Sequence, residues 1–466
     1  MSRPVVLGVD SSTQSVKVEA RSIESGEVVA AGAAKHPPTN PPVSEQDPTA
    51  WWSALVEAVA ALGDVRDDVV AVSVAGQQHG CVLLGDDGTP VRRAKLWNDT
   101  TSAAQADALV ERFGAATWAD RTGSVPVAAF TITKLAWVAE HEPETLASVA
   151  TVMLPHDYLT WMLTGEHVTD RGDASGSGWY DPSSDEVLPD LLGAAVGGDG
   201  ADWIGRVPRV LGPDELAGRL REDAARQLGL PVGIVVAPGS GDNMGAAMGL
   251  GLRAGDVAIS LGTSGTVFAV SDTPTHDPTR AVAGFASATG SFLPLVCTIN
   301  ATKVTDTVAR WLGTDPPGLA ELAMDAVSDP GAAMLVPYFD GERTPNLPDA
   351  TGTAYGLTTT TTREQLALAA HDGVLSSPQT IRAGTRYTVF SDSGWAGQHP
   401  ASRREPLTHE SDYLQIPGQL DPRIASLVDQ LTDGQEPFES ARTLEEHLRS
   451  NYQYTLDTAV SSQNVT

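Results

Sequence analysis

The chain contains the same local pattern twice, near residue 10 and again near residue 262. In each copy a short apolar stretch, Val5–Asp10 or Ile259–Gly262, runs into a turn of small hydroxylated residues, and another strand-like stretch follows. The turn of such a hairpin presents backbone amides and hydroxyls, which are groups that bind anions. Two hairpins of this kind favour a duplicated domain with nucleotide phosphates between the copies. Taken singly, each is also compatible with an ordinary tight turn.

A carboxylate stands in a glycine-rich segment shortly before the second hairpin. Asp242 lies between Gly241 and Asn243, where the backbone can approach a ligand closely. A carboxylate that accepts a proton and a loop that holds phosphate are the two parts of a phosphoryl-transfer site. Asp242 is also compatible with the cap of a helix over Met244–Gly249. The spacing of the glycines misses the dinucleotide-binding fingerprint by one residue, which excludes a Rossmann site.

Asp10 is the second candidate carboxylate. It follows a buried strand, so its side chain emerges at the carboxyl end of that strand, where ligands gather in α/β folds. An Asx-turn is the structural alternative.

The composition is that of a large acidic protein. At 466 residues the chain exceeds what one hydrophobic core usually organises, so we expect two or three domains. A net charge of -29 argues against nucleic acid or an anionic membrane as a partner, since both attract cationic surfaces. Cys81 and Cys297 lack CxxC spacing, so we expect no disulfide framework, no zinc site and a reducing cytoplasm. No targeting segment or membrane span is expected.

Hydrophobic periodicity predicts alternating helices and strands. Apolar spacing indicates helices over 102–110, 131–140 and 302–312, and β-branched runs indicate strands over 234–237 and 257–270. This alternation is typical of α/β domains.

Several segments of the sequence resemble the successive signatures of the xylulokinase branch of the FGGY carbohydrate kinase family. They follow the family's order and roughly its spacing, and the resemblance covers about residues 1–375. The segments are Gly8–Lys17, Ala75–Gly80, Leu96–Asp99, Leu154–Leu159, Gly241–Asn243, Leu261–Gly265, Pro337–Pro345 and Gly352–Leu357.

The resemblance implies a fold and an activity. The fold would be α/β, with two actin-like (ribonuclease H-type) lobes around a central cleft: a first lobe over 1–245 and an incomplete second lobe over 246–375. The activity would be ATP-dependent phosphorylation of D-xylulose at its terminal hydroxyl, with Mg²⁺. A kinase of another ketose or polyol, such as ribulose or glycerol, and a sugar-binding pseudoenzyme are the alternatives. A homodimer is left open.

The resemblance also implies roles for individual residues. Asp242 would be the catalytic base, and Asp10 would position the metal and phosphate. His156 and Asp157 match the family as structural residues. Gln78 stands where many xylulokinases have methionine, which we expect to change packing against the sugar more than the reaction. The implied sugar-binding residues are Gln78, His79, Trp97, Asn98, Asp99 and Asn243. The implied ATP-binding residues are Ser12, Thr13, Gln14, Lys17, Gly262, Thr263, Ser264 and Gly265.

The sequence departs from the family after Leu375. The family continues to a Gly-Gly-Gly-Ala turn that holds the adenosine, and no triple glycine follows here. Residues 376–466 instead resemble a segment that precedes the catalytic core of bacterial transglutaminase-like proteins, including a helix over Asp421–Asp433. No cysteine follows Cys297, so the tail brings no second activity. A chimeric chain with its seam near 373–380 is expected, with apolar surface around Val267, Phe268 and Leu366 left uncovered. A divergent kinase terminus is the alternative.

Overall fold

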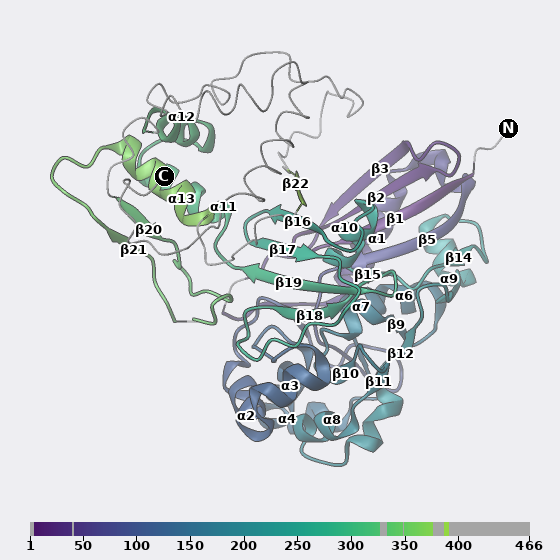
Figure 1. Ribbon diagram of the computed structural model, residues 1–466. Coiled ribbons are helices and arrows are strands. Elements are labelled where there is room, and N and C mark those ends of the chain that lie inside the picture. The colour runs from purple at the N-terminus through teal and green to yellow at the C-terminus, as the bar shows by residue number, and fades with distance from the viewer. Residues whose placement is uncertain (1–3, 40–41, 327–332, 348, 376–385, 391–466) are drawn as a thin grey trace, which may run out of the picture. The chain divides into compact units, whose positions relative to one another are not determined.

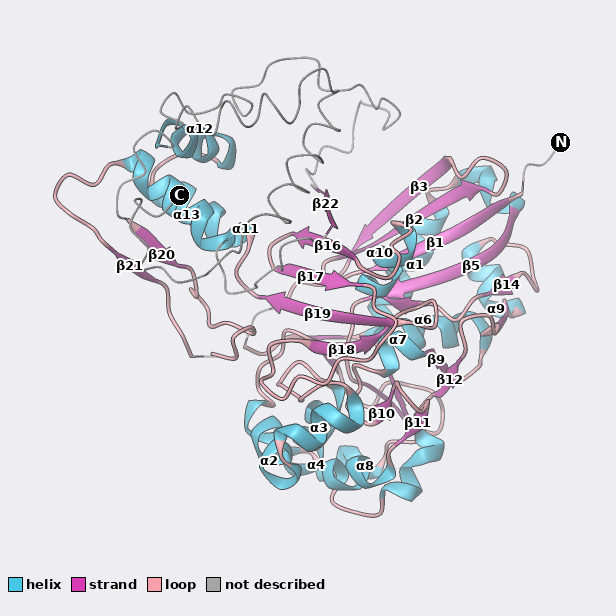
Figure 2. Cartoon of the chain, in the orientation of Figure 1, coloured by secondary structure: helices cyan, strands magenta, loops and turns pink. Residues whose placement is uncertain are grey.

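The computed structural model describes residues 4–39, 42–326, 333–347, 349–375 and 386–390. These residues belong to one compact unit, Met1–Ser393. Figure 1 follows this unit along the chain, and Figure 2 distinguishes its helices from its strands. Two larger sheets with helices packed on them give the mixed α/β architecture that the sequence predicts.

The first lobe is built on a seven-stranded sheet. Its strands follow the order β13-β14-β5-β1-β2-β3, and β15 also pairs with β5. Alternate residues of β1, namely Val5, Leu7 and Val9, are buried, as the period of a half-covered strand requires. The bounds are β1 (Val5–Ser11), β2 (Ser15–Ser22), β3 (Val28–Lys35), β5 (Val69–Gly76), β13 (Gly218–Arg219), β14 (Val235–Val236) and β15 (Ser240–Gly241).

Helices complete the core of this lobe. Helix α1 begins where the Asp47 carboxylate accepts a hydrogen bond from the backbone N–H of Thr49, with Pro48 in the first position. Its buried face carries Trp51 and Leu55 into the same core as the strands. The helices of this core are α1 (Pro48–Ala60), α6 (Pro155–Thr164) and α9 (Glu222–Leu228).

A second core combines helices that follow the first strands with strands of the second lobe. It contains α2 (Ala103–Phe113), α3 (Ala115–Thr122), α4 (Thr131–His141), α8 (Pro189–Val196) and α10 (Asp242–Gly249). The shorter helices are α5 (Pro143–Ala147), α7 (Arg171–Ala174) and the 3-10 helices over Gly63–Asp68 and Gly200–Arg206. Two-stranded sheets are formed by β4 (Glu45–Gln46) with β7 (Ala94–Lys95), β6 (Val82–Leu84) with β8 (Thr151–Met153), β9 (Val168–Asp170) with β12 (Arg209–Leu211), and β10 (Tyr180–Asp181) with β11 (Glu186–Val187).

The second lobe contains a five-stranded sheet with the order β18-β19-β17-β16-β22. Its strands are β16 (Asp256–Leu261), β17 (Gly265–Ala269), β18 (Ala283–Ala286), β19 (Phe292–Thr298) and β22 (Arg386–Phe390). A small separate core holds α11 (Thr302–Trp311), α12 (Pro316–Ala326) and α13 (Arg363–Leu375), and β20 (Met334–Val336) pairs with β21 (Thr353–Tyr355).

The predicted hairpins and helices are confirmed. β1 and β2, and likewise β16 and β17, are antiparallel pairs joined by the hydroxyl-rich turns. Helices α2, α4 and α11 lie where the periodicity predicts them, and α10 begins at Asp242 itself. Among the described residues, no helix is long and apolar enough to cross a membrane. Cys81 and Cys297 are buried free thiols.

The expectations for the end of the chain have mixed outcomes. Strand β22 lies beyond the expected seam and pairs in parallel with β16 of the second lobe. The expectation of an uncovered Phe268 is wrong, because only 2% of that residue is exposed. The helix expected over Asp421–Asp433 and the rest of the transglutaminase-like tail lie outside the described residues, so that resemblance stays a prediction.

Candidate active site

Three parallel strand ends bring the main candidate residues to one edge of the first sheet. Strands β1 and β15 both pair in parallel with β5, and Asp10 and Ser240 both lie opposite Ala75. Strand β5 ends at Gly76, directly before the Gln77–His79 segment, and β15 leads into Asp242. Ligand-binding groups of α/β folds collect at such carboxyl ends, so this edge is the candidate site.

The carboxyl group of Asp242 has a raised pKa. Burial raises its pKa to about 7, because desolvation disfavours the charged form, and the negative charge of Asp10 acts in the same direction. Opposing this, its Oδ1 accepts hydrogen bonds from the backbone N–H and the side-chain Nδ2 of Asn243, at 2.8 Å and 2.9 Å. The desolvation outweighs these bonds. A carboxyl group that titrates near neutral pH is suited to accept a proton during a reaction.

Asn243, the residue after Asp242, makes hydrogen bonds to residues of both lobes. Asn243 Nδ2 donates to Gln78 Oε1 at 3.2 Å, and Thr266 Oγ1 on β17 donates to Asn243 Oδ1 at 3.0 Å. The other end of the Gln78 amide, Nε2, is buried and has no hydrogen-bond partner among the described residues. A buried donor without a partner is costly, so Gln78 is suited to donate to a bound ligand.

Gly241 is required for this close packing. A Cβ atom at that position would lie 2.8 Å from Gln78 Cγ, well inside van der Waals contact. The glycine that precedes Asp242 therefore allows the end of β15 to approach the end of β5.

His79 is an uncharged imidazole between aromatic rings. It is 2% exposed, and burial lowers its pKa well below the usual value. Its ring stacks on Phe130 with centroids 5.0 Å apart and 10° between the planes, and Phe285 lies 5.3 Å away. Nδ1 lies 3.0 Å from the carbonyl oxygen of Gly176. This contact assigns the proton to Nδ1, so Nε2 can accept a hydrogen bond from a hydroxyl.

Trp97 and Thr13, expected on the sugar and on the phosphate side, contact each other. Trp97 Nε1 donates to Thr13 Oγ1 at 2.9 Å, and Thr13 Oγ1 donates to Gln77 Oε1 at 3.0 Å. Gln77 Nε2 and Asn98 Oδ1 are buried without partners among the described residues. Gln77 was not predicted, although its position directly after β5 and before Gln78 is the signal that would have found it.

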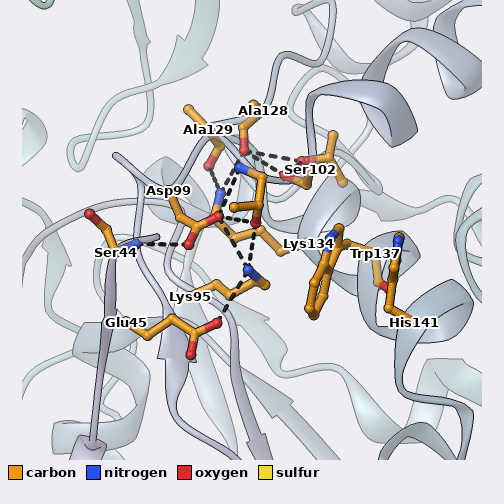
Figure 3. Close-up of polar contacts among 12 residues, drawn as sticks. Ser44, Glu45, Lys95, Asp99, Ser102, Ala128, Ala129, Lys134, Trp137 and His141 are labelled. Carbon is orange, nitrogen blue, oxygen red and sulfur yellow. Dashed lines mark hydrogen bonds and ion pairs between the residues drawn. The ribbon is translucent and has the colours of Figure 1, made fainter. Parts of the chain in front are cut away.

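Asp99 is buried in a separate group of polar contacts. The residue is 0% exposed, and its carboxylate accepts hydrogen bonds from the backbone of Ser44 and Thr101 and from Lys95 Nζ, at 2.9 Å, 3.0 Å and 3.2 Å. Figure 3 shows this carboxylate pointing toward Lys95 and Ser44. The carboxylate therefore has a full set of protein partners, and the expected contact with sugar stays a prediction.

The two hydroxyl-rich turns have ordered backbones. In the first turn, the backbone N–H and Oγ of Ser12 both donate to the carbonyl of Ser15, at 3.0 Å. Gln14 and Lys17 are exposed, and Lys17 lies directly opposite Asp10 in the β1–β2 pair.

In the second turn, the N–H of Gly262 donates to the carbonyl of Ser264 at 2.9 Å, and the N–H of Thr302 at the start of α11 donates to Gly262 at 2.9 Å. Thr263 is exposed, whereas Gly265 is buried. The first residue after this turn, Thr266, makes the contact with Asn243 described above.

His156, for which a structural role is expected, lies next to the end of β5, where a Cβ atom on Gly76 would be 3.0 Å from its own Cβ atom. Its Nε2 is 3.1 Å from Asp170 Oδ1, 3.3 Å from Asp157 Oδ1 and 3.4 Å from Asp173 Oδ2. These carboxylates outweigh the effect of burial and raise the pKa of His156 to about 9. Asp170 and Asp173 were not predicted, because their distance from His156 in the sequence hides the contact.

Two family models match most of the chain. Residues 5–249 match the N-terminal domain of the FGGY family of carbohydrate kinases, and residues 257–381 match its C-terminal domain. The chain belongs to the FGGY family of carbohydrate kinases.

Several relatives within this family are called xylulose kinases. The chain is 49% identical over 375 residues to that of Streptomyces rubiginosus, covering 80% of this chain and 75% of the relative. It is 37% identical over 377 residues to that of Escherichia coli, covering 79% and 76%. The crystal structure of xylulose kinase from Bifidobacterium adolescentis superposes with a TM-score of 0.70 at 45% identity, covering 80% of each chain.

Enzymes of the FGGY family use ATP and a divalent metal ion. Among the described residues, no group of three or more His, Cys, Asp or Glu side chains is arranged to hold a metal on its own. Mg²⁺ needs only one or two carboxylates together with substrate phosphates and water. Asp10, at the carboxyl end of β1 next to the first hydroxyl-rich turn, supplies one such carboxylate. The residues therefore fit the metal.

Proposed function

We propose that this FGGY kinase phosphorylates D-xylulose at its terminal hydroxyl, using ATP. The observation that carries the proposal is the environment of Asp242. Its pKa is about 7, and its neighbour Asn243 is hydrogen-bonded to Gln78 in the first lobe and to Thr266 in the second. The names of relatives at 49% and 37% identity support xylulose as the sugar.

In this proposal Asp242 is the general base. The hydroxyl oxygen of the sugar forms a bond to the γ-phosphorus, the bond from that phosphorus to the ADP oxygen breaks, and the hydroxyl proton passes to Asp242. A positioned carboxylate contributes on the order of 10²–10⁴ to such a step. The free Nε2 donor of Gln78 and the Nε2 acceptor of His79 would hold hydroxyls of the sugar, with the Trp97 ring and Asn98 beside them.

In this proposal both hydroxyl-rich turns contact ATP. Ser12, Thr13, Gln14 and Lys17 of the first turn, together with 262–265 of the second, would contact ATP. Thr13 would act through its fixed contacts with Gln77 and Trp97. Asp10 would hold Mg²⁺, which when bound neutralises phosphate charge. The cytoplasm is the proposed compartment, supported by the two buried free thiols.

A panel of sugars assayed by ADP release tests the substrate. We expect D-xylulose to give a higher kcat/KM than ribulose, glycerol or gluconate, and a higher value for one of these would replace it. Asp242→Asn tests the base: we expect kcat to fall by on the order of 10²–10⁴ while the calorimetric Kd for the sugar stays within about threefold. The exposed Asp214→Asn is the control. Full activity in Asp242→Asn would overturn the assignment.

A further inference from the structure

A buried lysine lies behind the proposed sugar site. Lys134 is 0% exposed, and its Nζ donates to three successive backbone carbonyls: Ala128 at 2.9 Å, Ala129, and Phe130 at 3.3 Å. Figure 3 shows the Lys134 side chain directed at Ala128 and Ala129. These carbonyls form the turn that leads into α4, with Phe130 as the residue before the helix.

This position is unfavourable for a lysine in two respects. An ammonium group loses its hydration when it is buried, and burial accordingly lowers the pKa of Lys134 to about 7. Lys134 also belongs to the first turn of α4, where the helix dipole disfavours positive charge. Apolar residues would fill the same volume without either cost. What the lysine adds is one donor group that joins all three carbonyls. The hydroxyls of Ser102 and Thr133 also donate to Ala128, and that of Thr133 to Phe130, whereas Lys134 is the side chain that donates to the carbonyl of Ala129.

The turn that Lys134 holds is also the support of His79. Phe130 stacks on the imidazole of His79, and Phe285 contacts both rings, with centroids 5.3 Å from His79 and 6.0 Å from Phe130. Thr131 Oγ1 next to this turn donates to the His79 carbonyl at 3.2 Å. The backbone of the turn thus fixes one side of the ring whose Nε2 faces the sugar in the proposed function.

We propose that Lys134 is a positioning residue for sugar binding: by holding the carbonyls of 128–130 it fixes Phe130, and through Phe130 it fixes the imidazole of His79. The proposal rests on the proposed role of His79. Lys134 touches neither sugar nor ATP and takes no part in proton transfer. Its loss lowers sugar affinity through a misplaced ring and leaves the ATP side unaffected.

The kinetic test compares Lys134→Met with Leu135→Ala. Methionine keeps an apolar chain of similar length but removes all three donors. Leu135 is the next residue of the same helix, is equally buried, and makes no hydrogen bond to the turn, so its truncation controls for loss of helix stability. We expect Lys134→Met to raise the sugar KM on the order of tenfold with kcat and ATP KM within about threefold, and Leu135→Ala to leave both KM values unchanged.

A double-mutant cycle with Phe130→Leu tests the route of the effect. If Lys134 acts through Phe130, the combined variant Phe130→Leu with Lys134→Met loses no more sugar affinity than Phe130→Leu alone. Additive losses would overturn the proposal, as would equal kinetics of Lys134→Met and Leu135→Ala. Should Lys134→Met fail to fold, Lys134→Leu, which also removes every donor, takes its place with the same expected direction.

A third measurement does not depend on the substrate. The ring resonances of His79 in histidine-labelled protein, assigned by their loss in His79→Asn, should shift or broaden in Lys134→Met and stay in place in Leu135→Ala. If the protein phosphorylates no sugar of the panel, the proposed function is wrong. The spectrum still tests the role of Lys134 in that case, because it requires no substrate. An unmoved His79 resonance in Lys134→Met would show that the lysine serves only the stability of α4.

Discussion

Asn243 donates two hydrogen bonds to a single oxygen of Asp242, one from its backbone N–H at 2.8 Å and one from its side chain at 2.9 Å. These bonds favour the ionised carboxylate and oppose the effect of burial. The charge state of the proposed base is therefore set by a balance that a single substitution can move.

The first prediction is a pH profile. Because Asp242 must be ionised to accept a proton and its pKa is about 7, kcat/KM should fall about tenfold for each pH unit below 7. Asn243→Ala removes the side-chain donor, which should move this acidic limb to higher pH. A limb that stays near pH 4 to 5 in the wild type would contradict the raised pKa.

The second prediction concerns the stability cost of Asp242. Its folded pKa of about 7 exceeds the value of about 3.9 in an unfolded chain. The folded state therefore binds more protons between these values, and the contribution of Asp242 to the free energy of unfolding falls as pH rises through this window. Asp242→Asn should be more stable than wild type at pH 8, by on the order of 1–2 kcal/mol after a discount for its partial exposure, and equally stable at pH 4. Urea denaturation at both pH values measures the difference, and equal stability at pH 8 would count against it.

The third prediction separates Asp99 from the sugar site. Asp99→Ala leaves the buried ammonium of Lys95 without one of its carboxylate partners, so the free energy of unfolding should fall by about 3 kcal/mol. The exposed Asp86→Ala should change it by less than about 0.5 kcal/mol. Folded Asp99→Ala should keep a sugar KM near that of wild type. A large rise in KM at unchanged stability would confirm Asp99 as a sugar ligand.

The fourth prediction uses two glycines at opposite ends of one short segment. Gly241→Ala places a Cβ atom 2.8 Å from Gln78 Cγ, so the end of β15 or the Gln78 side chain must move. We expect kcat/KM to fall on the order of 10²-fold, as for a small displacement of reacting groups. Gly249→Ala at the end of α10, where no atom lies within 4 Å of the new Cβ, should leave kinetics unchanged. Equal kinetics of the two variants would mean that this close approach is dispensable.

The fifth prediction concerns ATP. The sequence lacks the triple-glycine turn that the resemblance leads one to expect, whereas the family match extends over 257–381. As a kinase the protein should show calorimetric heats with ATP and Mg²⁺, with a Kd below about 1 mM. Heats with xylulose but none with ATP would instead establish a sugar-binding pseudoenzyme.

Local patterns in the sequence predicted part of the local structure, but they missed helix α1 in a region to which the sequence analysis assigned no helix. The two hairpins follow from apolar runs that end in hydroxyl-rich turns, and α4 and α11 follow from apolar spacing. What brings Asp10 beside Asp242 is the pairing of β5 with both β1 and β15, which no local pattern specifies. The placement of these two residues in one site therefore came from the family resemblance.

Buried polar groups were the main omission. Asp99 follows Trp97 and Asn98 directly, so sequence proximity suggested a shared role, but its carboxylate turns inward to Lys95. Lys134 escaped notice because lysines are seldom fully buried, and a helix pattern counts such a residue as a surface position.

The pairing of β5 also sets an order for biosynthesis. The ribosome releases β1, β5 and the residues after β5 long before β15, which then has to find its place on a strand already paired along its other edge. A nascent chain carries Gln78 and His79 from early in its synthesis but gains Asp242 only when β15 docks. Translation halted before that point yields a polypeptide that has the two residues proposed to bind the sugar and lacks the aspartate proposed to accept the proton.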